Sequence, residues 1–239
     1  MSFYIFCGAD GLGKTTIAKL LAQKLDKPYF KFPYGSDNDT EEIIYSGQRI
    51  RQILNKDHTC DPVAFQALQL INKLEAVPVL KALELKHGIV LVDRWSLSAL
   101  IYGEVDGVDR TWNEKICKLF DSQIQPAIVF IFTGTPFKND GDKYGKKQQQ
   151  IAALYDDYYK EHADDKRIVK IDVTGKSIET VAFEVLSHIV RDTMKIKPPV
   201  MSTTSTVAHM KEGQQFSLTD TQKGKDPDTS KRCYDSMVI

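Results

Sequence analysis

Short runs of apolar residues alternate with longer segments in which apolar positions recur every three or four residues. The runs cover residues 3–7, 29–32, 89–93, 127–132 and 168–172. Runs of this length are typical of buried strands. The three- to four-residue period in the segments between them is typical of amphipathic helices. The alternation predicts an α/β fold, with a parallel sheet that carries helices on both faces.

The segment between the second and third runs carries clear helix signals. Asp61 suits a helix N-cap and Pro62 the first helical position, while His87 and Gly88 form a stop just before the third run. Pro78 lies inside this segment and is expected to kink or divide the helix.

The character of the chain changes after about residue 194. Residues 195–239 have many small and charged side chains and few large apolar ones. Such a composition buries too little surface to offset the entropy of ordering. We therefore assign residues 1–194 to one folded domain and expect 195–239 to be a flexible tail, with a short docking segment for a partner as the alternative.

The composition argues against several classes of protein. Lysine plus arginine and aspartate plus glutamate both total 32, so no excess charge favours nucleic acid or an anionic membrane. The apolar runs are far shorter than the roughly 20 residues of a membrane helix, and the N-terminus lacks the features of a leader peptide. The four cysteines have no paired spacing, so free thiols in a cytoplasmic protein are expected.

The first run is followed by GADGLGKTT, which fits the phosphate-binding pattern GxxxxGK[ST] between a predicted strand and a predicted helix. Its glycines permit positive φ, so backbone N–H groups can point at phosphate oxygens, and the helix N-terminus adds partial positive charge. Lys14 is expected to reach the β and γ phosphates of ATP, and the Thr15 hydroxyl to bind Mg²⁺. The expected ATP-binding residues are Gly8, Gly11, Gly13, Lys14, Thr15 and Thr16.

The third run ends in Asp93 and Arg94. An aspartate at the carboxyl end of a neighbouring parallel strand is placed to bind Mg²⁺ through water. The adjacent arginine offers a planar fork of donors for phosphate oxygens, with an ordinary surface ion pair as the alternative. The NKxD pattern of switch GTPases does not follow any predicted strand, so a kinase is favoured over a GTPase.

At these residues the sequence resembles the thymidylate kinase family of nucleoside monophosphate kinases, over roughly residues 3–193. The shared features are GADGLGKTT, the FP pair after the second run, NKLE with the family's NRxE spacing, DRWSLSALIY with its DRxxxSxxxY pattern, Pro126 and IDVTGKSIETV. The resemblance implies a three-layer P-loop kinase fold with a five-stranded parallel sheet and a mobile lid. It also implies ATP, Mg²⁺ and phosphoryl transfer to a deoxynucleoside monophosphate, with dTMP as the first choice.

Carried over by position, the resemblance assigns Asp10 to the acceptor 3′-hydroxyl, Arg94 to both phosphates and Tyr102 to the exclusion of ribose. The lid is expected within residues 133–150, and Lys143 is expected to be its catalytic lysine. Lys138, Lys146 and Lys147 are the other lid bases, and a solvated charged loop is the alternative for each. The implied acceptor-site residues are Asp10, Phe32, Phe65, Gln69, Asn72, Lys73, Arg94, Ser98 and Tyr102.

Three departures from the family pattern concern the acceptor. The FPxR arginine is Gly35, the NRxE arginine is Lys73, and the phenylalanine that stacks on thymine is Gln69. Loss of an arginine from a phosphate costs about 1.5–3 kcal/mol unless another group replaces it. Arg49 and Arg51 are the candidate replacements, with solvent-facing charges as the alternative. The departures preserve the reaction class but leave the base open, so another or a modified base is an alternative.

Helical spacing places Phe65, Gln69, Asn72 and Lys73 on one side of the helix that begins at Pro62. The core stripe is then expected at Ala67, Leu70, Ile71 and Leu74. Phe65 is a candidate for the missing aromatic surface, although a buried core position is the commoner case for a phenylalanine. Gln69 is expected to pair with the polar edge of the base.

Two rival hypotheses remain. A deoxynucleoside kinase on the same scaffold needs a carboxylate that accepts a proton from the 5′-hydroxyl, and FPYG stands where such kinases place a glutamate after the second strand. A nucleotide-binding regulatory module is the third hypothesis, against which the complete phosphate-binding motif argues. The resemblance makes a homodimer a possible assembly, since family members are commonly dimers.

Overall fold

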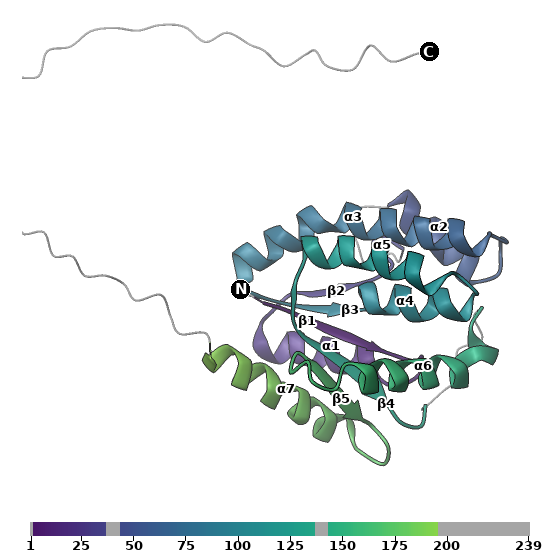
Figure 1. Ribbon diagram of the computed structural model, residues 1–239. Coiled ribbons are helices and arrows are strands. Elements are labelled where there is room, and N and C mark those ends of the chain that lie inside the picture. Colours follow the sequence, from purple (N-terminus) through teal and green to yellow (C-terminus); the bar gives the residue numbers. More distant parts are fainter. Residues whose placement is uncertain (1, 37–43, 137–142, 196–239) are drawn as a thin grey trace, which may run out of the picture. The chain divides into compact units, whose positions relative to one another are not determined.

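The computed structural model of the protein describes residues 2–36, 44–136 and 143–195. The strands are β1 (Ser2–Gly8), β2 (Tyr29–Lys31), β3 (Ile89–Asp93), β4 (Pro126–Thr133) and β5 (Ile168–Asp172). They form one parallel sheet in the order β2-β3-β1-β4-β5 (Figure 1). The expected α/β class with a five-stranded parallel sheet is therefore confirmed.

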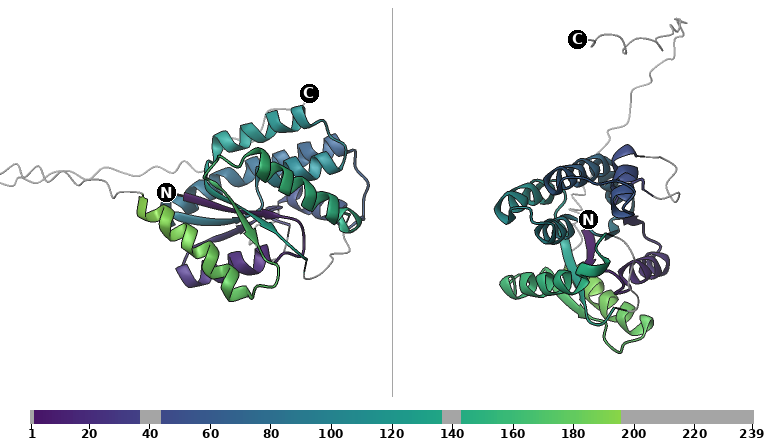
Figure 2. Two further views of the ribbon diagram at one scale, coloured as in Figure 1. Left: turned by 60° about the horizontal axis from the view of Figure 1, so that its bottom comes forward. Right: turned by 90° about the vertical axis from the view of Figure 1, so that its right-hand side faces the viewer.

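Helices cover both faces of this sheet. They are α1 (Lys14–Leu25), α2 (Tyr45–Leu54), α3 (Pro62–His87), α4 (Ser96–Val105), α5 (Arg110–Gln123), α6 (Gln148–Glu161) and α7 (Ile178–Lys195), with a short 3₁₀ helix, η1 (Gly145–Lys147), before α6. Helices α1 and α7 pack together on one face, and α3, α4, α5 and α6 lie on the other, with α2 packed on α3 (Figure 2). The result is three layers.

Strand β1 lies at the centre of the sheet, and all of its residues are buried. Phe6 pairs with Asp93 of β3 on one side and with Phe130 of β4 on the other. Just beyond β3, the backbone N–H of Arg94 donates to the Phe6 carbonyl oxygen at 3.0 Å. This register places the loop after β1 directly beside Asp93 and Arg94.

Helix α3 has the predicted ends. The Asp61 side chain accepts hydrogen bonds from the N–H groups of Val63 and Ala64 at 2.9 and 3.1 Å, which satisfies two donors of the first turn. Gly88 follows the last residue with φ 76°. Pro78 does not divide the helix, which continues through it to His87.

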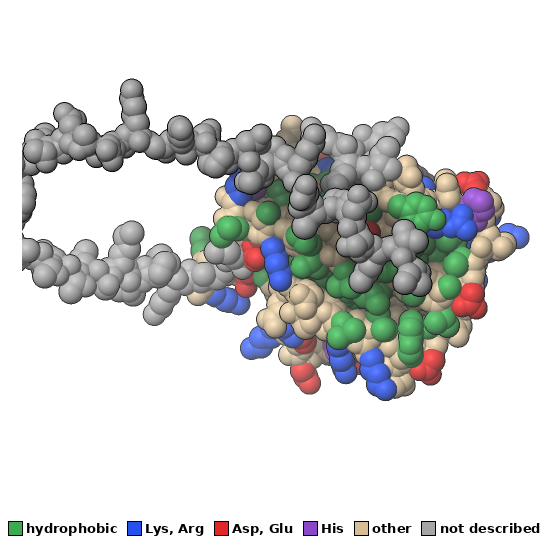
Figure 3. Space-filling view, turned by 90° about the horizontal axis from the view of Figure 1, so that it is seen from above, with side chains coloured by type: hydrophobic (Ala, Val, Ile, Leu, Met, Phe, Trp, Pro, Cys, Tyr) green, Lys and Arg blue, Asp and Glu red, His purple; other side chains and the backbone are tan. Residues whose placement is uncertain are grey.

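The predicted core stripe of α3 is wrong for two of its four residues, since Leu70 packs against the core and Ala67 is half-buried. Ile71 and Leu74 are 50% and 44% exposed, and hydrophobic side chains gather on this outer face (Figure 3). The buried side instead carries Phe65, Asn72 and Lys73. Asn72 is buried because it hydrogen-bonds to backbone groups, and Lys73 is buried because it lines a cavity. Hydrophobicity alone therefore does not determine which side of α3 is buried.

Parts of two predictions lie outside the described residues. These are the tail beyond Lys195 and residues 137–142 of the predicted lid, which include Lys138. The three described cysteines, Cys7, Cys60 and Cys117, are free thiols. Among the described helices, none combines the length and the apolar character needed to span a membrane.

Candidate active site

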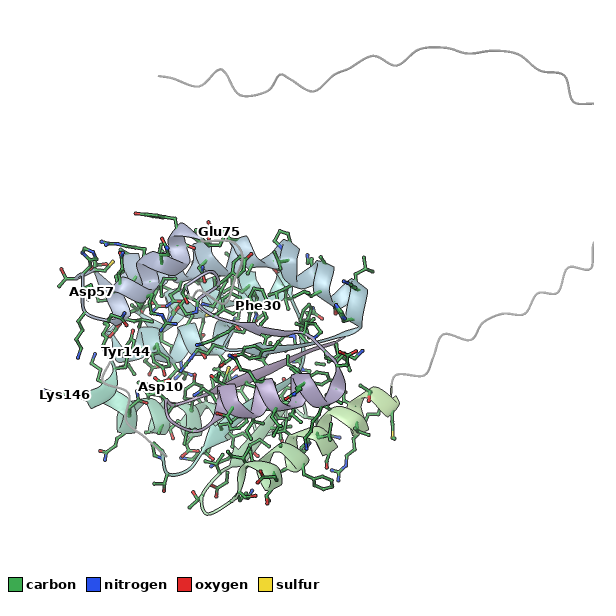
Figure 4. The ribbon with its side chains drawn as sticks, turned by 180° about the vertical axis from the view of Figure 1, so that it is seen from behind. Asp10, Phe30, Asp57, Glu75, Tyr144 and Lys146 are labelled. Atoms are coloured by element: carbon green, nitrogen blue, oxygen red, sulfur yellow. The ribbon has the colours of Figure 1, made fainter. Side chains whose placement is uncertain are left out.

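A cavity of about 780 Å³ lies at the carboxyl ends of the strands. The loop between β1 and α1 forms one side, and residues from β2, α2, α3, α4 and the segment before η1 form the other. Open parallel sheets bind ligands at this edge, and the volume is typical of small-molecule sites. Figure 4 shows Asp10 and Tyr144 near each other at this end of the sheet, with Lys146 further out.

The loop after β1 has the backbone conformation that its glycines predict. Gly8, Gly11 and Gly13 have φ of 136°, 76° and 77°. A Cβ on Gly8 would lie 2.4 Å from the carbonyl oxygen of Phe132, so a larger residue would clash with β4. Five of the six expected ATP-binding residues, all except Gly8, line the cavity.

Lys14 is the first residue of α1, and its side chain is buried at the cavity. Its Nζ donates to the Ala9 carbonyl oxygen. Burial and the nearby charge of Arg94 lower the pKa of Lys14 to about 8, against the opposing effects of Asp10 and Asp93. An anionic phosphate at this position would favour the charged ammonium.

Thr15 and Asp93 meet as the metal prediction requires. The Thr15 hydroxyl donates to Asp93 Oδ2 at 2.5 Å, and the Tyr29 hydroxyl donates to the same oxygen at 3.0 Å. Asp93 is 2% exposed, and its Oδ1 has no hydrogen-bond partner among the described residues. A hydroxyl oxygen beside a buried carboxylate with a spare oxygen fits a hydrated Mg²⁺ bound to nucleotide phosphates.

Asp10 is the centre of a hydrogen-bond network across the cavity. Its carboxylate accepts hydrogen bonds from Arg94 Nη2, from the Tyr102 hydroxyl at 2.7 Å and from Gln148 Nε2 at 3.1 Å. Burial opposes ionisation of Asp10, but Arg94 and Lys14 outweigh it and lower the pKa to about 2. The network therefore holds a fixed negative charge beside the arginine.

Gln148 is a member of this network that the sequence did not identify. Its Oε1 also accepts a hydrogen bond from the Asp10 backbone N–H at 2.9 Å. The side chain is buried at the start of α6, which is unusual for a glutamine. The only sequence feature that pointed to Gln148 was its position in the predicted lid. Its partner Asp10 lies 138 residues away in the chain, so no sequence pattern indicated the contact.

Aromatic packing holds Tyr102 in place. The rings of Tyr102 and Tyr144 pack edge to face, with centroids 4.7 Å apart. The Arg94 guanidinium lies 5.1 Å from the Tyr102 ring centroid. The Tyr102 hydroxyl and ring are thus both fixed by neighbours. Arg94 itself has φ 72°, so its backbone is in the left-handed region that β-branched and bulky residues avoid.

The lid lysines Lys143 and Lys147 point to a carboxylate and not to the phosphate loop. Asp106 accepts hydrogen bonds from Lys143 Nζ at 2.6 Å, from the Tyr144 hydroxyl at 2.7 Å and from Lys147 Nζ at 3.2 Å. Burial opposes ionisation of Asp106, yet these donors lower its pKa. The predicted catalytic Lys143 does not line the cavity in this conformation.

The helix α3 brings two of its four predicted residues to the cavity. Gln69 and Lys73 line it, and Lys73 Nζ lies 3.3 Å from Gln69 Oε1. Lys73 is 2% exposed, and burial together with the charge of Arg94 lowers its pKa to about 8. Its ammonium also lies 5.5 Å from the Phe32 ring centroid.

Phe65 and Asn72, predicted to bind the acceptor, lie elsewhere. Phe65 packs in a separate cluster with Ile50 and Ile53, so the structure favours its core alternative. Asn72 exchanges hydrogen bonds with the backbone N–H and carbonyl of Tyr34 at 2.8 and 2.9 Å. Both side chains support the segment after β2 and the helix α2, and neither lines the cavity.

Phe32 and Ser98 do reach the cavity. Phe32 follows β2 and packs against Trp95, with ring centroids 5.3 Å apart. The Ser98 hydroxyl lies 3.0 Å from the Tyr155 hydroxyl and 3.6 Å from Cys7 Sγ, so it also contacts the core. Trp95 lines the cavity as well and was not predicted to.

The structure distinguishes the two candidate replacements for the missing arginine. Gly35 has φ 65°, and a Cβ there would lie 2.6 Å from Ile44 Cβ, so no arginine fits at that position. Arg51 of α2 lines the cavity, and its Nη2 donates to Ser36 Oγ at 3.3 Å. Arg49 does not line it and donates to Gln52 on the exposed side of α2.

The far end of the cavity is formed by residues just before and within α7. Val173, Lys176, Ser177 and Val181 line it there. Lys176 Nζ donates to Glu184 Oε2 at 2.7 Å, which holds the lysine against α7. These residues belong to the stretch IDVTGKSIETV, whose pattern gave no specific role to any of them.

Comparison with known proteins agrees with this geometry. A model of the thymidylate kinase family matches residues 6–185. A probable thymidylate kinase of Methanocaldococcus jannaschii is 30% identical over 190 residues, which are 78% of this chain and 95% of that protein. A thymidylate kinase of Malacoplasma penetrans is 30% identical over 178 residues, which are 70% of this chain and 78% of that protein.

Solved structures share the fold. Thymidylate kinase from Candida albicans has a TM-score of 0.64 and 22% identity, with 80% of this chain and 92% of that chain covered. Thymidylate kinase from Ehrlichia chaffeensis has a TM-score of 0.61 and 22% identity, with 79% of this chain and 98% of that chain covered.

Proposed function

The chain belongs to the thymidylate kinase family, and from this premise we propose that it transfers the γ-phosphoryl group of ATP to dTMP, giving ADP and dTDP. One observation carries the proposal. A single cavity joins a phosphate-binding loop to the paired side chains of Asp10 and Arg94, so donor and acceptor phosphates can meet within it.

The donor half positions the triphosphate and neutralises its charge. Phosphoryl transfer passes through a loose transition state, so alignment and charge stabilisation are what the protein supplies. Backbone N–H groups of the loop and Lys14 provide both. Thr15 would hold Mg²⁺ directly and Asp93 would hold it through water, and the ion would neutralise negative charge on the phosphates.

The acceptor half binds a deoxynucleotide. Arg94 bridges the two phosphates, and Asp10 accepts a hydrogen bond from the 3′-hydroxyl because it is ionised at neutral pH. The ring of Tyr102, held by Tyr144 and Arg94, would exclude a 2′-hydroxyl. Lys143 would have to leave Asp106 to reach the phosphates, so its catalytic role stays a prediction.

Among the residues that the structure describes, none that lines the cavity is a general base of the kind a nucleoside kinase needs. The carboxylates that line the described part of the cavity are Asp10 and Asp93. Asp10 is a weak base because its pKa is about 2, and Asp93 is bound by Thr15 and Tyr29. A monophosphate acceptor is already ionised, with a second pKa of about 6, and needs no base.

A coupled assay of ADP formation tests the proposal. ATP and Mg²⁺ would be supplied with dTMP, dUMP, dCMP, dAMP, dGMP or thymidine, and we expect the highest kcat/KM with dTMP. Lys14→Ala is the inactive control for contaminating kinases. Faster turnover of thymidine than of dTMP would favour the nucleoside kinase. ATP consumption that is independent of every acceptor would contradict both.

Assembly and location stay predictions. A homodimer would cover apolar side chains that α3 and α5 expose, such as Ile71, Leu74 and Leu119, and sedimentation velocity would measure the mass in solution. Nucleotides are the proposed small-molecule partners, and the cytoplasm is the proposed location. Removal of residues 196–239, which lie outside the described residues, is expected to leave turnover near wild type.

A further inference from the structure

Gln66 is a buried polar residue that the proposed mechanism does not use. It lies on α3 one turn before Gln69 and lines the acceptor half of the cavity. The side chain is 3% exposed, and its Oε1 has no hydrogen-bond partner among the described residues. A buried carbonyl oxygen is destabilising unless a donor reaches it. A ligand N–H or O–H would complete the site.

The position of this amide is restricted by α4 and α5. A Cβ on Gly103 would lie 3.2 Å from Gln66 Cδ and 2.3 Å from Asn113 Nδ2. Asn113 is itself fixed, because its Nδ2 donates to the carbonyl oxygens of Ala99 and Leu100 at 3.2 Å each. The glycine therefore makes the space in which the Gln66 amide lies.

The Lys73 ammonium supplies a donor to the same wall. Its Nζ lies 3.5 Å from the backbone oxygen of Gln69, so it is displaced back along α3 in the direction of Gln66. Within the described ranges no carboxylate pairs with Lys73. The wall thus presents an unsatisfied acceptor and a cationic donor, which suit a ligand edge with an N–H next to a carbonyl oxygen.

Resting on the proposed function, we propose that Gln66 is a specificity-determining residue whose Oε1 accepts a hydrogen bond from the N3–H of thymine or uracil, while Lys73 donates to the neighbouring ring carbonyl oxygen. Cytosine has an acceptor nitrogen at the same ring position. In the same pose that nitrogen would face the Gln66 oxygen, and two acceptors repel each other.

Steady-state kinetics of Gln66→Leu with four nucleotides test the proposal. We expect kcat/KM for dTMP and for dUMP to fall by the same factor, about three- to tenfold, with an unchanged KM for ATP. N3-methyl-dTMP, measured as substrate or as inhibitor, lacks the N–H and should bind both proteins equally, and dCMP should not lose activity. Gln23→Leu, an exposed substitution on α1, is the matched control.

Thermal unfolding separates recognition of the base from a structural role. The ligand-free Gln66→Leu protein should have a Tm equal to or above that of the wild type, because the substitution removes an unsatisfied oxygen. A structural role would lower it. If Gln66→Leu does not fold, Gln66→Met serves for the same comparisons.

Three outcomes would overturn the inference: an unchanged kcat/KM for dTMP, an equal loss with N3-methyl-dTMP, or unequal losses for dTMP and dUMP. A wild-type protein that does not phosphorylate dTMP would instead contradict the proposed function. The two failures are therefore distinguishable.

Discussion

The two halves of the cavity are built in different ways. The donor half is one continuous loop in which glycine conformations and Lys14 are set by adjacent residues. The acceptor half takes side chains from α2, α3 and α4, with Gln148 supporting it from α6. A site made of backbone groups tolerates few changes in its sequence, whereas a site made of side chains can bind the same ligand with different residues. The departures from the family pattern all fall in the second half.

Removal of the Lys14 ammonium should have the largest effect, because the donor half has one lysine at its centre. We expect Lys14→Ala to lower kcat by about 10²- to 10³-fold, with circular dichroism showing an unchanged fold. The coupled assay at saturating ATP and dTMP measures this. A variant with more than a tenth of the wild-type rate would contradict the role of the loop.

Lys73 should destabilise the acceptor half in the absence of ligand. Its pKa of about 8 lies below the ordinary value of 10.5, so the unfolded chain binds the proton more tightly between these values. Folding stability therefore rises as pH increases through this window, and the penalty is fully present below about pH 8. Lys73→Met should raise the free energy of unfolding at pH 7 by about 3 kcal/mol.

Urea unfolding of both proteins at pH 7 and at pH 9.5 checks this sign. The advantage of Lys73→Met should shrink at the higher pH, because the wild-type lysine is then largely neutral when buried. Lys170→Met is the matched control, since Lys170 is partly exposed and paired with Asp156. An advantage that does not change with pH would show that packing and not charge causes it.

The same contrast explains how much the sequence could predict. Strands β3 and β5 match their predicted bounds because buried parallel strands appear as continuous apolar runs. The phosphate loop was also recognisable, since its chemistry is contained in nine adjacent residues. The buried face of α3 was not, because Asn72 and Lys73 are buried through contacts with Tyr34 and with the cavity. Contacts of this kind join distant segments and leave no periodic signal.

Arg51 and Arg49 form a natural matched pair for a test of the acceptor half. They lie two residues apart on α2, but only Arg51 lines the cavity. Arg51→Ala should raise the KM for dTMP by about tenfold, because a charged hydrogen bond to phosphate is worth about 1.5 kcal/mol or more. Arg49→Ala should leave it unchanged. Equal effects of the two substitutions would remove Arg51 from the phosphate site.

The smallest expected effect concerns the sugar. Tyr102 combines a ring that we propose to exclude a 2′-hydroxyl with a hydroxyl that donates to Asp10 at 2.7 Å. Tyr102→Phe keeps the ring, so the ratio of kcat/KM for dUMP over UMP should hold. Both values should fall by about fivefold, which corresponds to about 1 kcal/mol, because Asp10 loses one hydrogen bond but keeps those from Arg94 and Gln148. Tyr102→Ala should lower that ratio as well. If the ratio survives in Tyr102→Ala, the ring does not select deoxyribose, and Tyr102 acts only by positioning Asp10.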